Sequence, residues 1–150
     1  MHYFLKEYEA SYAYYRPYVG IRDALKLDIY TSELVKIAYV SRQVGDSVLA
    51  QRLMAEYEPY ALNDQGLYGD LSRAMLHAYN GQNDMAIESL RAFTNKDDFF
   101  YWAIFFLPLD PILEPVRSKP EYKQIFDDIS ERFWERHEEL KTSLVDKQLL

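Results

Sequence analysis

The chain has 150 residues, of which 49% are apolar and 27% charged, enough for one compact domain and too few for the larger enzyme barrels. Its formal net charge of −7 argues against nucleic-acid binding by the whole surface, because phosphate contacts need a basic face. The absence of cysteine excludes disulfides, thiolate zinc sites and cysteine nucleophiles.

Neither a targeting signal nor a membrane span is recognisable. The amino terminus has no basic region followed by an apolar stretch. The longest uncharged apolar run, Phe99–Leu109, is shorter than the roughly 20 residues that a membrane span needs. We therefore expect a cytoplasmic chain that is not inserted in a membrane, whether it is a whole protein or one domain of a longer one.

Tyrosines crowd the amino-terminal stretch. Large amphipathic rings of this kind suit either the edge of a core or contact with a partner. We favour the first interpretation, in which these residues cap one end of a helical stack. They are Tyr3, Tyr8, Tyr12, Tyr14, Tyr15 and Tyr18.

Helical periodicity begins at Ser32 and continues through most of the chain. Apolar residues recur at steps of three and four from Ser32 to a turn at Gly45, which is typical of one face of a helix. A second helix is predicted from this turn to about Pro59. A third, at about Tyr68–Tyr79, is separated from a fourth by a turn at Gly81. Such short inner turns predict antiparallel helical hairpins.

Small residues repeat at one spacing. Three pairs are separated by 36 positions: Gly45 and Gly81, Ala38 and Ala74, and Ala50 and Ala86. Glycine permits the turn conformation, and alanines in both helices let the two backbones approach closely. The spacing therefore predicts two copies of one hairpin.

This pattern resembles the tetratricopeptide repeat, a helical hairpin of about 34 residues. The resemblance implies an all-α fold, a right-handed α–α superhelix of hairpins, with residues 31–66 and 67–102 as two repeats. The stretch Ala24-Leu25-Lys26-Leu27-Asp28 is similar to the end of another repeat. Residues 2–30 are therefore predicted to form a degenerate first hairpin, with Pro17 near the start of its second helix.

The segment after the repeats strengthens the resemblance. Asp110-Pro111 followed by Ser118-Lys119-Pro120-Glu121-Tyr122 is similar to the tail of tetratricopeptide-like regions in bacterial winged-helix transcriptional regulators and adenylate-cyclase-like signalling proteins. Residues 103–150 are then a connector and a long carboxyl-terminal capping helix. That helix is predicted to begin with a capping box formed by Ser118 and Glu121.

The apolar stripe of this last helix has two interpretations. It can cover the open end of the helical stack, or it can pair with the same helix of a second copy, because its residues recur at heptad-like spacing. The residues assigned to a homodimer contact are Phe126, Ile129, Phe133, Leu140 and Leu144.

No catalytic or metal-binding constellation is visible. The histidines His2, His77 and His137 are far apart in sequence, and the segment from His137 carries Lys141 where a zinc-protease motif needs a second histidine. The sequence also has no phosphate loop, nucleophile elbow or calcium loop. We therefore expect no enzyme activity, no cofactor and no metal.

Function is predicted to reside in a groove, since the first helices of stacked hairpins line the concave face of a superhelix. A mixture of Tyr, Met, Lys and Arg there suits a peptide or a helix, although Met75 is equally suited to packing against a neighbouring hairpin. The predicted partner-binding residues are Lys36, Tyr39, Arg42, Gln43, Tyr68, Ser72, Met75 and Tyr79.

The sequence thus predicts a non-catalytic protein-interaction or scaffold module, in the sensory or assembly region of a bacterial regulator. The positive charges of Lys36 and Arg42 make an acidic or carboxylate-bearing peptide one candidate partner. Two alternatives stay open: a dimerisation module acting through the last helix, and a small-ligand receptor with a pocket under Phe99–Phe106.

Overall fold

The protein is helical throughout the part that the structure, a computed structural model, describes. This part is residues 1–96 and 101–149, and it contains no strand. The all-α prediction is therefore confirmed. The elements, with 3-10 helices labelled η, are α1 (Tyr8–Ala24), η1 (Thr31–Glu33), α2 (Leu34–Gln43), α3 (Ser47–Asn63), α4 (Gly69–Tyr79), α5 (Asn83–Thr94), α6 (Trp102–Phe105), η2 (Leu107–Leu109), η3 (Pro111–Val116) and α7 (Pro120–Asp146).

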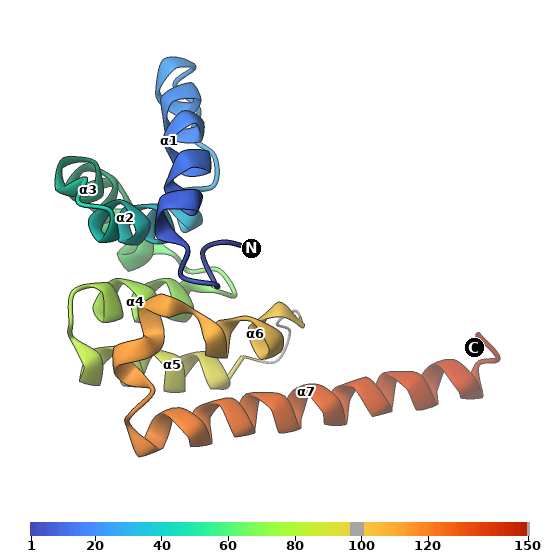
Figure 1. Cartoon of the computed structure of the whole chain (residues 1–150). Helices are drawn as coiled ribbons and strands as arrows, with labels where there is room; N and C mark the ends of the chain where they lie inside the picture. The colour runs from blue at the N-terminus through green and yellow to red at the C-terminus, as the bar shows by residue number, and fades with distance from the viewer. Residues whose placement is uncertain (97–100, 150) are drawn as a thin grey trace.

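Two helical hairpins, α2–α3 and α4–α5, form the centre of the molecule (Figure 1). Their turns have the same geometry, with Gly45 at φ 90° and Gly81 at φ 72°, in the left-handed region that favours glycine. Each glycine N–H donates to the carbonyl three residues earlier, at 3.2 and 3.1 Å. The next N–H donates to the carbonyl five residues earlier, at 2.8 Å in both turns.

The small residues that share the 36-residue spacing lie between these helices. Ala38, Ala74 and Ala86 are completely buried, and Ala50 is nearly so. The two hairpins are joined by Tyr57 of α3, whose hydroxyl donates to the carbonyl of Ser72 in α4 at 2.9 Å. Close helix packing therefore accounts for the spacing of alanines in the sequence.

The predicted first hairpin within residues 2–30 is wrong. One helix, α1, spans 17 residues there, and Pro17 lies inside it rather than at the start of a second helix. Helical hairpin turns often contain a residue in the left-handed region, and such residues flank α1, at Lys6 and Lys26, instead of interrupting it.

A partly buried ion pair attaches α1 to the first hairpin. Arg22, whose side chain is only 6% exposed, donates from both terminal nitrogens to the carboxylate of Glu56 in α3, in one case at 3.0 Å. The paired hydrogen bonds match the planar geometry of both groups and so set the position of α1 on α3.

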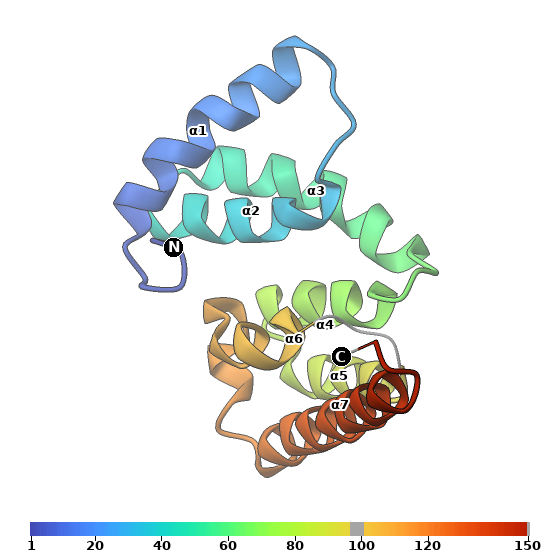
Figure 2. The same ribbon diagram turned by 90° about the vertical axis from the view of Figure 1, so that its right-hand side faces the viewer.

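The first seven residues fold back across the chain and reach the connector. The Tyr3 hydroxyl, in a buried position, donates to Oδ1 of Asp110, and Lys6 Nζ lies 2.6 Å from Oε1 of Glu114. Asp110 is the N-cap residue of η3 and Glu114 lies within it, so the amino-terminal segment meets the connector. Figure 2 shows the amino terminus near one end of α2, above the α6–η3 segment.

Prolines shape that connector. Pro108, Pro111 and Pro115 lie within η2 and η3, where short 3-10 segments replace a longer α-helix. The Asp110 side chain begins η3 by accepting the N–H of Ile112 at 3.0 Å. The uncharged run before it falls partly outside the described residues, at Phe99 and Phe100.

The last helix, α7, is 27 residues long and begins at Pro120, with Lys119 as its N-cap residue. The capping box predicted for Ser118 does not form, because Ser118 precedes the cap. Tyr122, Ile125 and Ile129 are buried against the second hairpin. Figure 1 shows the rest of α7 extending well past that hairpin.

The residues predicted to form a homodimer contact fall into two groups, one packed against the core and one on the extended part of α7. Ile129 is buried within the molecule, and Phe126 and Phe133 are partly buried against the same core. Leu140 is 59% exposed, and Leu144 is half-buried on the extended part of the helix. Over the described residues, no helix, α7 included, is both long and apolar enough to cross a membrane.

Candidate binding site

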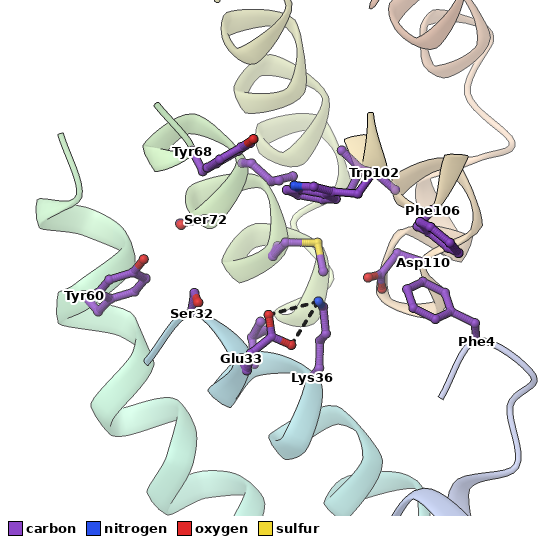
Figure 3. A pocket seen from close by; sticks show the side chains of 14 residues that line it. Phe4, Ser32, Glu33, Lys36, Tyr60, Tyr68, Ser72, Trp102, Phe106 and Asp110 are labelled. Atoms are coloured by element: carbon purple, nitrogen blue, oxygen red, sulfur yellow. Dashed lines mark hydrogen bonds and ion pairs between the residues drawn. The ribbon is translucent and has the colours of Figure 1, made fainter. Parts of the chain in front are cut away.

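A pocket of about 200 Å³ opens between the two hairpins (Figure 3). Its floor is formed by the first helices of both, α2 and α4. Its sides come from the amino-terminal segment, the end of α3, and the α6–η2 region. The described residues that line it are Phe4, Ser32, Glu33, Val35, Lys36, Tyr60, Tyr68, Leu71, Ser72, Met75, Trp102, Phe106, Leu107 and Asp110.

Aromatic rings from distant parts of the chain form two of the walls. Tyr68, the N-cap residue of α4, and Trp102 of α6 lie with their ring centroids 5.2 Å apart and their planes tilted by 41°. Phe4 and Phe106 form a second pair, with a centroid separation of 5.7 Å. Figure 3 shows these rings around one side of the opening. They give the pocket a mostly apolar lining of fixed shape.

Three charged side chains complete the lining. Lys36 Nζ lies 3.1 Å from Oε2 and 3.3 Å from Oε1 of Glu33, one turn earlier, so its charge is paired within the pocket. Asp110 lies opposite this pair, and its carboxylate points into the pocket on the side of Lys36 (Figure 3). With both carboxylates ionised, the three groups carry a net charge of −1.

Asp110 is the most constrained of the three. The residue is 2% exposed, and its Oδ1 atom accepts the hydrogen bonds from Tyr3 and from the N–H of Ile112. Its Oδ2 atom accepts none from the part of the chain that the structure describes. No lysine or arginine of that part lies within ion-pairing distance of the carboxylate.

Burial raises the pKa of the Asp110 carboxyl above its ordinary value. The hydrogen bond from Tyr3, the positive charge of Lys36 and the N–H of Ile112 oppose that rise, because each stabilises the ionised form. Burial and the nearby Asp110 charge also raise the pKa of the Tyr3 hydroxyl, which therefore remains a hydrogen-bond donor.

The structure brings half of the predicted groove residues to this pocket. Lys36, Tyr68, Ser72 and Met75 line it, although Ser72 and Met75 are largely buried. Gln43 lies outside it and is exposed.

The remaining three predicted residues form a separate cluster at the other end of α2 and α4. The Arg42 guanidinium lies 4.0 Å from the ring centroid of Tyr79 and 5.6 Å from that of Tyr39. It also donates to the carbonyl of Tyr79 at 3.1 Å. Tyr39 in turn packs edge-on against Tyr3 and Tyr8. The amino-terminal segment therefore packs against this end of α2.

Sequence reasoning missed Phe4 and Asp110 as pocket residues. Contacts across more than 100 residues of chain bring them together with α2, and no local pattern indicates such a contact. Trp102 and Phe106 had a signal, since the alternative with a ligand pocket under Phe99–Phe106 includes both. That run is not fully buried, because Tyr101, Phe105 and Phe106 are all at least 46% exposed.

Nothing in the pocket has the composition of a metal centre. Among the described residues, no three histidine, aspartate or glutamate side chains gather where they could hold a metal ion. Comparison of the chain with known protein families, with curated proteins and with solved structures finds no match in any of the three.

Proposed function

We propose that the protein is a non-catalytic, tetratricopeptide-like binding module that recognises a protein partner by holding one of its side chains in the pocket between α2 and α4. Such a module would serve as the assembly region of a regulatory protein. The observation that carries the proposal is the pocket itself, open to the surface and walled by Tyr68, Trp102 and Phe106. Interfaces typically depend on a few anchor residues that fill pockets of this kind.

Pocket size favours a side chain over a whole small molecule. Small-molecule sites are usually about 300–1,000 Å³, whereas this pocket measures about 200 Å³. The matched hairpin turns and buried alanines support the tetratricopeptide-like assignment, because that repeat depends on both features. The amino-terminal segment covers the Tyr39 end of the groove, so the partner would enter at the Trp102 end.

Peptides selected from a random display library test the proposal. Affinities for the selected peptides would be measured by fluorescence anisotropy on the wild-type chain and on two variants. Phe106→Ala removes a pocket wall and should weaken binding at least tenfold. Phe105→Ala is the matched control, since Phe105 is also about half exposed on α6 but does not line the pocket.

Equal effects of the two substitutions would contradict the proposal, because the pocket would then have no special part in binding. Failure to enrich any peptide over an unrelated helical protein would also contradict it. Circular dichroism of both variants would show whether the helices remain intact.

A second function is favoured by one further observation. The part of α7 that extends past the second hairpin exposes Trp134, Leu140 and Val145 by 45%, 59% and 53%. We propose that this part pairs with the same helix of a second copy of the chain, so that the module is a homodimer.

A further inference from the structure

We propose that the pocket binds an alkylammonium group, the chemistry of a lysine side chain, with Asp110 as its counter-ion and the aromatic rings around its methylene groups. This inference specifies the partner's anchor side chain as a lysine, and in that respect it rests on the proposed function. Neither an acidic nor a purely apolar anchor fits the observed lining as well.

The first support is the state of Asp110. A buried carboxylate without a cation is costly, and proteins usually pair such a group or bind a ligand with it. Asp110 is 2% exposed, yet its Oδ2 atom accepts no hydrogen bond from the described residues. Its carboxylate points into the pocket, so a bound cation would supply the missing partner (Figure 3).

The second support is the arrangement of the rings. Tyr68 and Trp102 form one wall, and Phe4 and Phe106 form another. The faces of aromatic rings carry partial negative charge, and they attract ammonium groups within about 6 Å, with Trp the strongest. The same faces bury methylene groups, so a chain of carbons ending in a cation matches both parts of the pocket.

The third support is the charge balance. Lys36 is paired with Glu33 at 3.1 Å, and Asp110 adds a second carboxylate, so the lining has a net charge of −1. An anionic group would meet this charge and the negative ring faces together. The presence of Lys36 therefore does not make this an anion site, although its sequence position alone had suggested an acidic partner.

Binding of n-butylammonium chloride tests the proposal without requiring a partner. Its cation has the four carbons and the ammonium group of a lysine side chain. Fluorescence of Trp102 would report binding in a Trp134→Phe background, which leaves Trp102 as the only tryptophan. We expect saturable, millimolar binding of n-butylammonium and at least tenfold weaker binding of n-butanol and of butyrate. Equal binding of all three would mean an apolar pocket and would overturn the proposal.

Variants give a sharper test. Asp110→Asn should weaken n-butylammonium binding at least tenfold, because an Asn still accepts the bonds from Tyr3 and Ile112 but carries no charge. Glu114→Gln is the control: it removes another connector carboxylate, which pairs with Lys6 outside the pocket, and should leave binding unchanged. If Asp110→Asn does not fold, Glu33→Gln provides the same loss of negative charge from the opposite side.

Whether loss of the Lys36 charge strengthens or weakens n-butylammonium binding distinguishes a cation site from an anion site. Lys36→Met removes the positive charge of the pocket and frees Glu33, so n-butylammonium should bind several times more tightly. Weaker cation binding together with lost butyrate binding would overturn the proposal.

Peptide selection distinguishes failure of this inference from failure of the proposed function. Selected peptides with a required lysine support both. Selected peptides that need a leucine or phenylalanine instead leave the proposed function standing and overturn the ammonium assignment. Binding of n-butylammonium without any selected peptide supports the ammonium site and identifies a small free amine, not a protein, as its ligand.

Discussion

Asp110 has two roles that act against each other in the folded protein. Its side chain begins η3 and accepts the Tyr3 hydroxyl, so it joins the amino-terminal segment to the connector. Its negative charge, however, lies in a buried place where it is costly. A residue that destabilises the ligand-free protein is expected at a site whose role is to bind a ligand rather than to stabilise the fold.

The pH dependence of stability follows from the direction of its pKa shift. Burial raises the pKa of Asp110 in the folded state, while Lys36 and Tyr3 oppose the rise and Glu33 adds to it. Between the unfolded pKa and this higher folded pKa, the folded protein holds a proton that the unfolded chain has lost. The contribution of Asp110 to stability therefore falls as the pH rises through that interval.

Asp110→Asn should remove this dependence. As the pH rises above the ordinary pKa of an aspartate, the wild type should lose stability relative to the variant, until the raised pKa of Asp110 is passed. Urea unfolding at a series of pH values, followed by circular dichroism, measures the difference. A difference that stays constant with pH, or changes in the opposite direction, would show that Asp110 is not held in an unfavourable charged state.

At the scale of elements, the two hairpin turns require the same left-handed backbone conformation of their glycines. Gly45 and Gly81 have φ values of 90° and 72°, and a Cβ atom added at either would meet nothing within 4 Å. The cost of alanine there is therefore backbone strain alone, without steric contact. Gly20 differs, because it lies inside α1 with an ordinary backbone conformation and open space around it.

Substitution by alanine should thus have opposite effects at these positions. Gly45→Ala and Gly81→Ala are each expected to lower the free energy of unfolding by about 1 kcal/mol. Gly20→Ala should raise it by about 0.5–1 kcal/mol, because alanine is the better helix former. Chemical denaturation of the three variants measures all of these values. If either turn variant were more stable than the wild type, the inference that both turns need a glycine would be contradicted.

The same elements show what the sequence could and could not predict. Turn chemistry and close packing are local, so Gly45, Gly81 and the alanines indicated both hairpins correctly. The false hairpin before them came from the similarity of Ala24–Asp28 to the end of a repeat, whereas one helix, α1, precedes that stretch and contains Pro17 at an exposed position. The α2 and α4 sides of the pocket could be predicted from the repeat pattern, and the alternative of a pocket under Phe99–Phe106 indicated the side formed by Trp102 and Phe106. Phe4 and Asp110 reach it through contacts between segments far apart in sequence.

For the whole molecule, the open question raised by the fold is what stabilises the far part of α7. The helix is attached through Tyr122, Ile125 and Ile129, and it continues well beyond them (Figure 1). Isolated helices shorter than about 12–15 residues are marginally stable in water, so an extended end with exposed apolar residues is expected to have a partner.

A second copy of the chain suits this end by its charge. Residues 134–147 carry four acidic and three basic side chains, whereas the whole chain has a net charge of −7. Because both signs of charge are present in nearly equal numbers, two α7 ends can meet with little net repulsion. Because Phe126, Ile129 and Phe133 are engaged with the core, Leu140 and Leu144 remain from the predicted contact, and Trp134 and Val145 add exposed apolar surface on an adjoining side of the helix.

The expected result is a dimer in light scattering, about twice the 17.8 kDa of one chain. Ending the chain after residue 138 removes Leu140, Leu144 and Val145 and should yield a monomer that keeps its thermal unfolding transition, because the buried part of α7 is intact. Leu140→Ser with Leu144→Ser should have the same effect. The control pair Glu139→Ser and Asp146→Ser changes exposed residues on the side of the helix away from all four of these apolar residues and should remain dimeric. A monomeric full-length chain would exclude the pairing, whatever the variants do.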